Sequence, residues 1–381
     1  MQIYMDHAAT TKLSETALSA MLPYMREYYG NPSSLHGAGM QTAHAVYSAR
    51  STIANLLGCT PRELYFTASG SESDNQALFS AAAWGKAHGR QHIITSAFEH
   101  PAVLRTLEYL ETQGFTVTRL PISKDGLILT SQIEQTLQTD TALVSVMTVN
   151  NEIGTIQPVS EIGALCRRHG VLFHTDAIQA AGALPISVDE IQADLLSVSA
   201  HKFYGPKGIG LLYVREGIPP VSVIRGGNQE RGNRAGTENV SAIVGMAAAF
   251  TEAAAQMHET NIHLTALRKH LIERLKDIPK VHFIGEQATC VPGIVNVCFE
   301  GVENEMLLLL LSKDGICVSA GSACASGALE TSHVLRSMNL PTHLLKTAVR
   351  FSFGRDNTLE EVNIATAYVK KAVLKLRKDL L

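Results

Sequence analysis

The chain has 381 residues, of which 45% are hydrophobic and 18% are charged, and its formal net charge is −3 at pH 7. A single hydrophobic core stops growing below this length, so we expect a folded protein with a large and a small domain. The small net charge gives no overall attraction to nucleic acid or to an anionic membrane, so direct binding of nucleic acid is not expected.

Three further features set the expected compartment and exclude some sites. The first residues lack the basic and apolar regions of a signal peptide, and the apolar run 306–311 is far too short to span a bilayer. The six cysteines contain no C-x-x-C pair, which fits a reducing compartment. We therefore expect a cytoplasmic protein with no membrane partner. The histidines form no H-E-x-x-H or similar cluster, so no metal site is expected.

Short β-rich runs alternate with helix-like stretches between residues 60 and 215. We expect strands at 64–67, 92–95, 116–120, 142–149, 171–175, 195–199 and 210–214. This alternation predicts an α/β fold with a large, doubly wound and mostly parallel sheet. The nearly continuous apolar run at 142–149 is typical of a strand covered on both faces. Ligands of such sheets bind beyond the carboxyl ends of the strands, where ordinary turns also lie.

The second part of the chain predicts a smaller α/β unit. Residues 241–276 read as a helix that could carry the chain out of the large domain. We then expect strands at 293–299, 315–319 and 348–353, and helices at 304–311 and 359–380. We therefore predict a large domain over 13–255 and a small domain over 256–381, which residues 1–12 join.

Two charged residues follow neighbouring predicted strands. Asp176 comes just past a buried run, where it could cap a following helix or hold a pyridine nitrogen protonated. Lys202 directly follows the next apolar strand and stands beside Ser199 and His201. It could emerge to solvent, or it could be desolvated, with a lowered pKa, and form a Schiff base with an aldehyde.

Two turns upstream could complete a binding site. Gly70 and Ser71 lie between a strand and a helix, where backbone amides, the helix dipole and a hydroxyl could hold a phosphate monoester. A serine-rich helix cap explains the same residues. His100 follows the strand around Ile94 and could stack on a flat ring, or it could be a surface turn residue.

The loop VSAGSACASGAL and the strand after it add a thiol and a guanidinium. Cys324 lies among glycine, serine and alanine, whereas a structural cysteine normally has large apolar neighbours. A thiol on such a loop could move between a site and solvent. Arg350 could clamp a carboxylate with two hydrogen bonds, or it could form a surface salt bridge.

Ten motifs occur in one order: DHAATT, GNPSSLHG, SGSESDN, EHPAVL, VNNEIG, HTDAIQ, SAHKFYGPKG, RAGTEN, GSACAS and RFSFGR. Through them the chain closely resembles the cysteine desulfurases of the NifS/IscS type, from about residue 2 to residue 378. These enzymes have the class V aminotransferase fold, a type I fold of pyridoxal-phosphate-dependent transferases. Ser71 stands where the family often has threonine, a change that keeps the hydroxyl.

The resemblance implies a pyridoxal 5′-phosphate site. Lys202 would carry the cofactor as a Schiff base, Asp176 would pair with the ring nitrogen, and His100 would stack on the ring and take part in catalysis. The remaining implied cofactor contacts are Gln179 at the ring hydroxyl, Asn151, and the phosphate ligands Gly70, Ser71, Ser199 and His201. Thr237 would reach the phosphate from the second subunit of a homodimer.

The resemblance also implies the reaction. Asn151 and Arg350 would bind the carboxylate of L-cysteine, and Cys324 would be the nucleophile that accepts its sulfur as a persulfide while L-alanine is released. The sulfur would pass to an acceptor protein, either an iron–sulfur scaffold or an enzyme of tRNA or cofactor thiolation.

The acceptor and the preference between sulfur and selenium stay open at this stage. The chain stops soon after the helix at 359–380, so we expect it to lack the longer tail by which some relatives engage an iron–sulfur scaffold. The basic residues of that helix would form a solvated face or meet an acidic carrier. The alternative functions are another class V enzyme, such as an aminotransferase or a selenocysteine lyase, and a catalytically idle binding partner.

Overall fold

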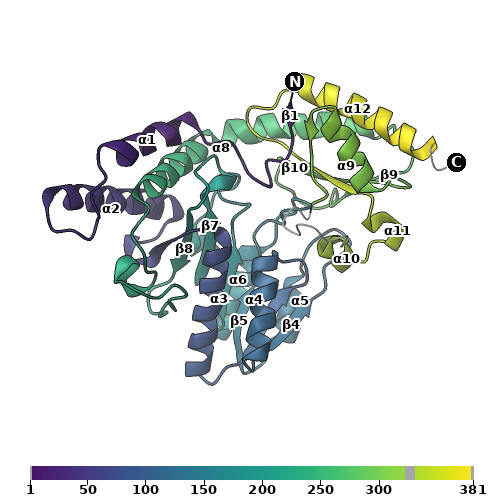
Figure 1. Ribbon diagram of the computed structural model, residues 1–381. Coiled ribbons are helices and arrows are strands. Elements are labelled where there is room, and N and C mark those ends of the chain that lie inside the picture. Colours follow the sequence, from purple (N-terminus) through teal and green to yellow (C-terminus); the bar gives the residue numbers. More distant parts are fainter. Residues whose placement is uncertain (1, 322–330, 379–381) are drawn as a thin grey trace.

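A seven-stranded sheet forms the centre of the structure, a computed structural model that describes residues 2–321 and 331–378 (Figure 1). The strand order is β2-β8-β7-β6-β5-β3-β4. The strands are β2 Leu64–Thr67, β3 His92–Ser96, β4 Thr116–Leu120, β5 Thr141–Ser145, β6 Leu172–Asp176, β7 Leu195–Ser199 and β8 Gly210–Val214. Strands β3 to β7 run parallel, and β8 is antiparallel to both of its neighbours. The predicted doubly wound, mostly parallel sheet is confirmed.

One predicted strand is too long. The apolar run 142–149 was expected to be a single strand, but β5 ends at Ser145. Residues 146–149 stay buried, and Val149 instead forms an antiparallel bridge with Ile156. Gly154, at φ +77°, closes the intervening turn. A buried apolar run does not show where the ladder ends, because the turn that follows is also buried.

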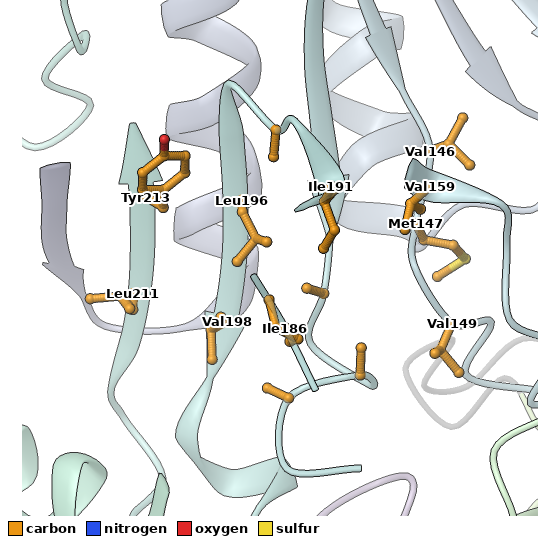
Figure 2. Packing of buried hydrophobic residues seen from close by; sticks show 14 of the residues in the cluster. Val146, Met147, Val149, Val159, Ile186, Ile191, Leu196, Val198, Leu211 and Tyr213 are labelled. Carbon is orange, nitrogen blue, oxygen red and sulfur yellow. The ribbon is translucent and has the colours of Figure 1, made fainter. Parts of the chain in front are cut away.

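Helices cover both faces of the sheet. They are α1 Glu15–Arg26, α2 Gly37–Leu57, α3 Gly70–Ala87, α4 Pro101–Thr112, α5 Thr130–Thr136, α6 Val159–His169, α7 Val188–Ile191 and the long α8 Val240–Leu275. Helices α3 and α4 pack on one face with residues such as Leu78 and Leu107. Helices α2, α6 and α8 pack on the other. Figure 2 shows part of this second face, where Leu196 and Val198 of β7 lie beside Leu211 and Tyr213 of β8.

The face of the sheet that packs against α3 is apolar where the strands begin and polar where they end. Its residues near the strand starts, Leu143, Leu172 and Leu195, belong to an apolar cluster with α3 and α4. Its residues toward the carboxyl ends are polar and buried, namely Ser145, His174, Asp176, Ser197 and Ser199. Because side chains alternate across a strand, all of these point to the same side of the sheet. The fold therefore places a buried polar layer at one edge.

The small domain has its own sheet and core. Strands β9 Val281–Ile284, β10 Ile294–Phe299 and β12 Ala348–Ser352 form an antiparallel sheet, and β1 Ile3–Tyr4 pairs with β11 Ile316–Cys317. The helices here are α9 Asn304–Lys313, α10 His333–Ser337, α11 Thr342–Leu345 and α12 Leu359–Lys378. The N-terminal residues thus lie beside the C-terminal part of the chain (Figure 1).

Helix α8 runs from α1 and α2 to α12 and so links the two regions (Figure 1). Its first half packs in the large core through Ile243 and Phe250, and its second half packs in the small core through Leu267 and Leu271. Our predicted boundary at 255/256 falls inside this helix. Among the described helices, α8 alone is long and apolar enough to cross a membrane, a test that core helices also pass. Of its most apolar window, 44% is buried in this structure.

A buried ion pair anchors the segment that leads to Thr237. Arg50 on α2 donates from Nη1 to Glu230 Oε2 at 2.7 Å, and the Phe66 amide donates to the same oxygen at 3.1 Å. Glu230 and Arg231 both have positive φ, 47° and 59°, which is costly for residues with a Cβ. The ion pair and the amide bond offset this strain and fix the path of residues 229–232.

We predict that Glu230→Ala lowers the free energy of unfolding by about 3 kcal/mol or more, because it leaves the Arg50 guanidinium buried without its partner. Chemical denaturation would measure this loss. The matched control is Glu108→Ala at the exposed Arg105–Glu108 pair, which should cost less than about 1 kcal/mol. Equal losses in the two variants would contradict the anchoring role.

Candidate active site

A cavity of about 410 Å³ lies at the carboxyl ends of the central strands, next to the buried polar layer. It is lined by residues of the large sheet and its loops, and by Arg350 of β12. The predicted site residues that line it are Gly70, Ser71, His100, Asn151, Asp176, Gln179, Ser199, His201, Lys202 and Arg350. The fold therefore gathers these residues from distant parts of the sequence around one space.

Two predicted site residues are not part of this lining. Thr237 is exposed and borders a separate cavity of about 240 Å³ with Thr67 and Ala68. Cys324 lies outside the described residues, so its predicted role as nucleophile stays a prediction. Described residues on both sides of segment 322–330 line the cavity. Gly321 directly precedes this segment, and His333 lies two residues beyond Thr331.

Lys202 ends a short 3-10 helix, Ala200–Lys202, that directly follows β7. Its Nζ donates to the carbonyl oxygens of Ala8 at 2.6 Å and Ala9 at 2.9 Å. The alternative that this lysine emerges to solvent is therefore wrong. The N-terminal segment holds the amine at the cavity, where it can react with a carbonyl group.

Asp176 is the last residue of β6 and is buried. Its Oδ1 accepts a hydrogen bond from the Ile178 amide at 2.9 Å. No described helix starts there, so Asp176 closes a turn and does not cap a helix. Burial raises the pKa of Asp176, whereas the Ile178 amide and the nearby Lys202 charge lower it.

A second carboxyl, Asp74 of α3, lies fully buried behind Asp176. Neither of its oxygens has a hydrogen-bond partner among the described residues, and Oδ1 is 3.7 Å from His174 Nε2. Burial and the Asp176 charge raise the pKa of Asp74 well above its usual range, although the nearby Ser197 hydroxyl opposes this. Because each carboxyl disfavours ionisation of the other, and the Lys202 charge lowers the pKa of Asp176, ionisation of Asp176 is favoured over that of Asp74.

The N-terminus of α3 faces the cavity through Gly70 and Ser71. Ser69 caps the helix by accepting a hydrogen bond from the Glu72 amide at 3.1 Å, so the expected serine cap is Ser69. A Cβ on Gly70 would lie 2.2 Å from Ile178 Cδ1, so a larger residue here would require the Ile178 side chain to move. The free amides of the first turn and the helix dipole can bind an anion here.

His100 and His201 both line the cavity, and the pKa of each is lowered, so both imidazoles are neutral at pH 7. His100 caps α4 by accepting a hydrogen bond from the Ala102 amide on Nδ1 at 3.1 Å. Burial, followed by the Lys202 charge, lowers the pKa of His100 to about 4. The same two causes lower the pKa of His201 to about 4. The alternative of a surface turn residue does not fit His100, which is half-buried and lines the cavity.

Arg350 is 1% exposed, so the alternative of a surface salt bridge is wrong. Its Nη2 donates to Asp6 Oδ1 at 2.8 Å, and its Nη1 donates to the Asn151 carbonyl at 2.9 Å. Its Nε finds no acceptor among the described residues. The guanidinium is thus fixed by a carboxylate and by the carbonyls of Asn151 and Gly321, and it keeps donor capacity for an anion.

The sequence analysis missed several residues that complete the site. Ala8 O also accepts a hydrogen bond from Gln179 Nε2 at 2.9 Å, so one carbonyl holds both Gln179 and Lys202. Glu152 and His333 line the cavity as well. The motifs DHAATT and VNNEIG contain Asp6, Ala8 and Glu152, but nothing in their spacing shows that these residues meet Arg350 and Lys202.

The donor set fits pyridoxal phosphate. It combines an amine for the aldehyde, a buried carboxylate for the ring nitrogen, a helix N-terminus for the phosphate and a neutral imidazole. The cavity volume lies within the range usual for small-molecule sites. Across residues 2–321 and 331–378, no group of three or more His, Cys, Asp or Glu residues could hold a metal ion.

Comparisons with known proteins agree with this site. A sequence model of the family Aminotransferase class-V matches residues 3–364. The chain is 47% identical to the cysteine desulfurase IscS of Methanosarcina thermophila, over 98% of this chain and 93% of that one. A solved NifS-like protein has a TM-score of 0.92 at 37% identity, and the match covers 97% of this chain and 99% of that one.

A second solved structure, of SspA in complex with cysteine, has a TM-score of 0.81 at 34% identity, and the match covers 94% of this chain and 100% of that one. These matches span nearly the whole chain, at identities well above those that indicate a shared fold alone. The resemblance noted from the ten motifs is therefore confirmed. The chain belongs to the aminotransferase class-V family and, within it, to the cysteine desulfurases of the NifS/IscS type.

Proposed function

We propose that this protein is a pyridoxal-phosphate-dependent cysteine desulfurase that transfers sulfur from L-cysteine to Cys324 and releases L-alanine. The observation that carries this proposal is the convergence of Lys202, Asp176 and Arg350 on one cavity. Relatives with 42–47% identity are cysteine desulfurases, and the SspA structure contains cysteine. A lysine and a buried carboxylate serve the cofactor, and a buried arginine suits the carboxylate of an amino acid.

The lining of the cavity supports a proposed set of cofactor contacts. Lys202 would bind the aldehyde carbon, Asp176 the ring nitrogen and Gln179 the ring hydroxyl. The phosphate would lie among Gly70, Ser71, Ser199 and His201, and Asn151 and His100 would flank the ring. Bound there, pyridoxal phosphate supplies an electron sink for charge that develops at the substrate Cα. Asp176, as the ionised member of the buried carboxyl pair, keeps the ring nitrogen protonated.

The chain's own residues then position the substrate and move protons. Arg350 binds the substrate carboxylate together with Asn151, and its pairing with Asp6 fixes the plane of the guanidinium. When it is not bound to the cofactor, the Lys202 Nζ would be a base within the cavity that could remove the Cα proton of the substrate. His100 stays neutral at pH 7, so it adds no charge beside this amine.

The proposed sulfur transfer conserves atoms and electrons and needs no added oxidant. The Cys324 thiolate attacks the sulfur of the bound cysteine, an S–S bond forms and the C–S bond breaks. The bonding electrons pass to the substrate carbon, which takes up a proton. The products are L-alanine and a persulfide on Cys324, which an acceptor protein then reduces or removes.

A homodimer is part of the proposal. Exposed apolar side chains gather on α1, on α2 and on the segment between them, including Met25, Tyr29 at 83% exposed and Leu35 at 93% exposed. An apolar surface of this kind is typical of an interface with another protein. Thr237 is exposed and lies outside the cavity lining, as expected if it completes the phosphate site of a second copy.

For the sulfur acceptor we propose only a class, namely a protein of iron–sulfur cluster assembly or of tRNA or cofactor thiolation. A cytoplasmic location agrees with the free thiols of Cys59, Cys166, Cys290, Cys298 and Cys317. One part of the predicted basic surface of α12 is already engaged, because Arg377 donates to the carbonyls of Pro279 and Glu300. The remaining lysines of that helix stay available to a partner or to solvent.

Two variants separate cofactor chemistry from sulfur transfer. We predict that Lys202→Ala lowers alanine production from cysteine at least about 1,000-fold, because the cofactor link and the base are both lost. Cys324→Ala should lower it at least about 100-fold while the cofactor absorption still changes on addition of cysteine. Unchanged turnover in Cys324→Ala would refute the persulfide, and a wild type without a cofactor absorption band would refute the proposed function.

Mixed dimers test the position of Thr237. We predict that Thr237→Val weakens cofactor affinity about tenfold, measured by absorption titration, because a phosphate hydrogen bond is lost. Thr112→Val, at the exposed end of α4, is the control. In a dimer of one Lys202→Ala subunit and one Thr237→Val subunit, the remaining lysine site should bind the cofactor with wild-type affinity. Weakened binding there would place Thr237 in its own subunit's site.

The neutral state of His100 gives a pH prediction. Its pKa in the folded protein lies near 4, below the usual value, so its proton is absent at pH 8 and appears only as the pH approaches 4. We therefore expect the ratio of cofactor affinities of wild type and His100→Phe to stay constant from pH 8 to 5.5. Phenylalanine keeps a flat ring and cannot titrate. An inflection of this ratio near pH 6.5 would show that His100 titrates normally.

A further inference from the structure

Glu72 and Arg234 form an ion pair at the start of α3, and the mechanism above uses neither side chain. Glu72 is the third residue of the helix, and Arg234 lies three residues before Thr237 in the motif RAGTEN. Arg234 Nε donates to Glu72 Oε1 at 2.9 Å, and its Nη2 donates to Oε2 at 3.3 Å. The Glu72 side chain is 13% exposed and that of Arg234 21%. This two-point, partly buried contact is better defined than most surface ion pairs.

The Glu72 side chain folds back over the beginning of the helix. Its Oε2 also accepts a hydrogen bond from the Ala68 amide at 2.9 Å, while its own amide donates to Ser69 Oγ at 3.1 Å. Ala68 and Ser69 directly precede Gly70 and Ser71, which line the cavity. The carboxylate therefore lies at the same end of the helix as the amides that would bind the phosphate.

This position creates an electrostatic conflict that a positive partner removes. A carboxylate in the first turn interacts favourably with the positive end of the helix dipole, and a bound phosphate depends on the same positive end. A phosphate monoester carries nearly two negative charges at neutral pH, so an unpaired Glu72 would repel it. The Arg234 guanidinium makes the pair neutral, which leaves the helix end free to attract the phosphate.

Further contacts hold Arg234 against α3 but outside the cavity. The carbonyl of Asn233 accepts a hydrogen bond from Gln76 Nε2, one turn further along the helix, at 2.9 Å. Arg234 lines the neighbouring cavity of about 240 Å³ together with Ala68, and it is not among the described residues that line the larger one. Any effect of Arg234 on a ligand in the larger cavity is therefore expected to act through Glu72.

We propose that Arg234 is a positioning residue for the phosphate site, which holds the Glu72 carboxylate at the helix start and neutralises its charge. This inference rests on the proposed function, which places a phosphate at the N-terminus of α3. It predicts that affinity for the phosphate follows the net charge of the pair. A purely structural tie between the two segments would instead lower the affinity whenever either side chain is changed.

The test measures the affinity of the full-length, cofactor-free protein for pyridoxal 5′-phosphate by absorption titration. Arg234→Gln leaves one negative charge and should weaken binding about tenfold or more. Glu72→Gln leaves one positive charge and should strengthen binding about threefold or more. Arg234→Lys and the double variant Glu72→Gln, Arg234→Gln both keep the pair neutral and should stay within about threefold of wild type. Glutamine retains hydrogen-bonding groups at either position.

Two further readouts separate a charge effect from a structural defect. Pyridoxal, which lacks the phosphate, should bind all of these variants within about twofold of wild type, because the pair acts on the phosphate alone. Raising the ionic strength from about 0.05 M to about 0.5 M should reduce the deficit of Arg234→Gln at least about threefold, since salt screens the repulsion. A structural defect would weaken both ligands and would persist in salt.

A matched control and a second variant address folding. Arg119 on the edge strand β4 forms a two-point pair with Glu111, through hydrogen bonds of 2.8 and 2.7 Å. Arg119→Gln breaks this pair and should leave the affinity for pyridoxal 5′-phosphate unchanged. If Arg234→Gln fails to fold, Glu72→Gln decides the question, because stronger binding supports the inference and equal or weaker binding overturns it.

Inorganic phosphate, titrated by calorimetry, distinguishes this inference from the proposed function. Wild type that binds phosphate but not the cofactor would contradict the proposed function alone, and the order of phosphate affinities among the variants would still decide the role of Arg234. Wild type that binds neither would overturn both. If wild type binds the cofactor, equal affinity in Arg234→Gln, or a double variant as weak as Arg234→Gln, would overturn the inference and leave the proposed function intact.

Discussion

The whole site depends on bringing one amine and one buried carboxyl together at the same end of the central sheet. Asp176 ends β6 and Lys202 lies just after the neighbouring parallel strand β7, so the fold brings them to the same end of the sheet. Each has its own support, because two backbone carbonyls hold the lysine amine and the Ile178 amide binds the carboxylate. Burial and the Asp176 charge raise the pKa of the nearby Asp74 carboxyl well above its usual range, which favours a single negative charge for a cationic ring nitrogen.

The N-terminal residues connect this charged pair to the small domain. Ala8 and Ala9 contact Lys202, and Asp6 two residues earlier pairs with Arg350. Residues 6–9 thus contact both the proposed cofactor lysine and the proposed substrate-binding arginine. The turn at Asn151 and Glu152 bridges the same two regions from the large sheet. These two segments therefore tie the reacting groups to the carboxylate-binding arginine.

Most of the strands and several site residues could be predicted from the sequence. Runs such as 64–67 and 195–199 are apolar, β-rich and bounded by turn residues, and the structure has strands at the same bounds. The end of β5 could not be predicted, because residues 146–149 stay apolar and buried after the ladder ends. The burial of Arg350 could not be predicted either, because its partner Asp6 lies 344 residues away in the sequence.

The sequence by itself determined the family, the sheet and which residue types carry the chemistry, because ordered motifs and strand patterns are local properties of the chain. Only the tertiary structure decided how those residues are used. It showed that Lys202 faces inward, that Arg350 is buried, that Asp74 is a second buried carboxyl near Asp176 and that Glu152 accepts a hydrogen bond from Ser332. Each of these depends on contacts between distant segments, and spacing along the chain contains no information about such contacts.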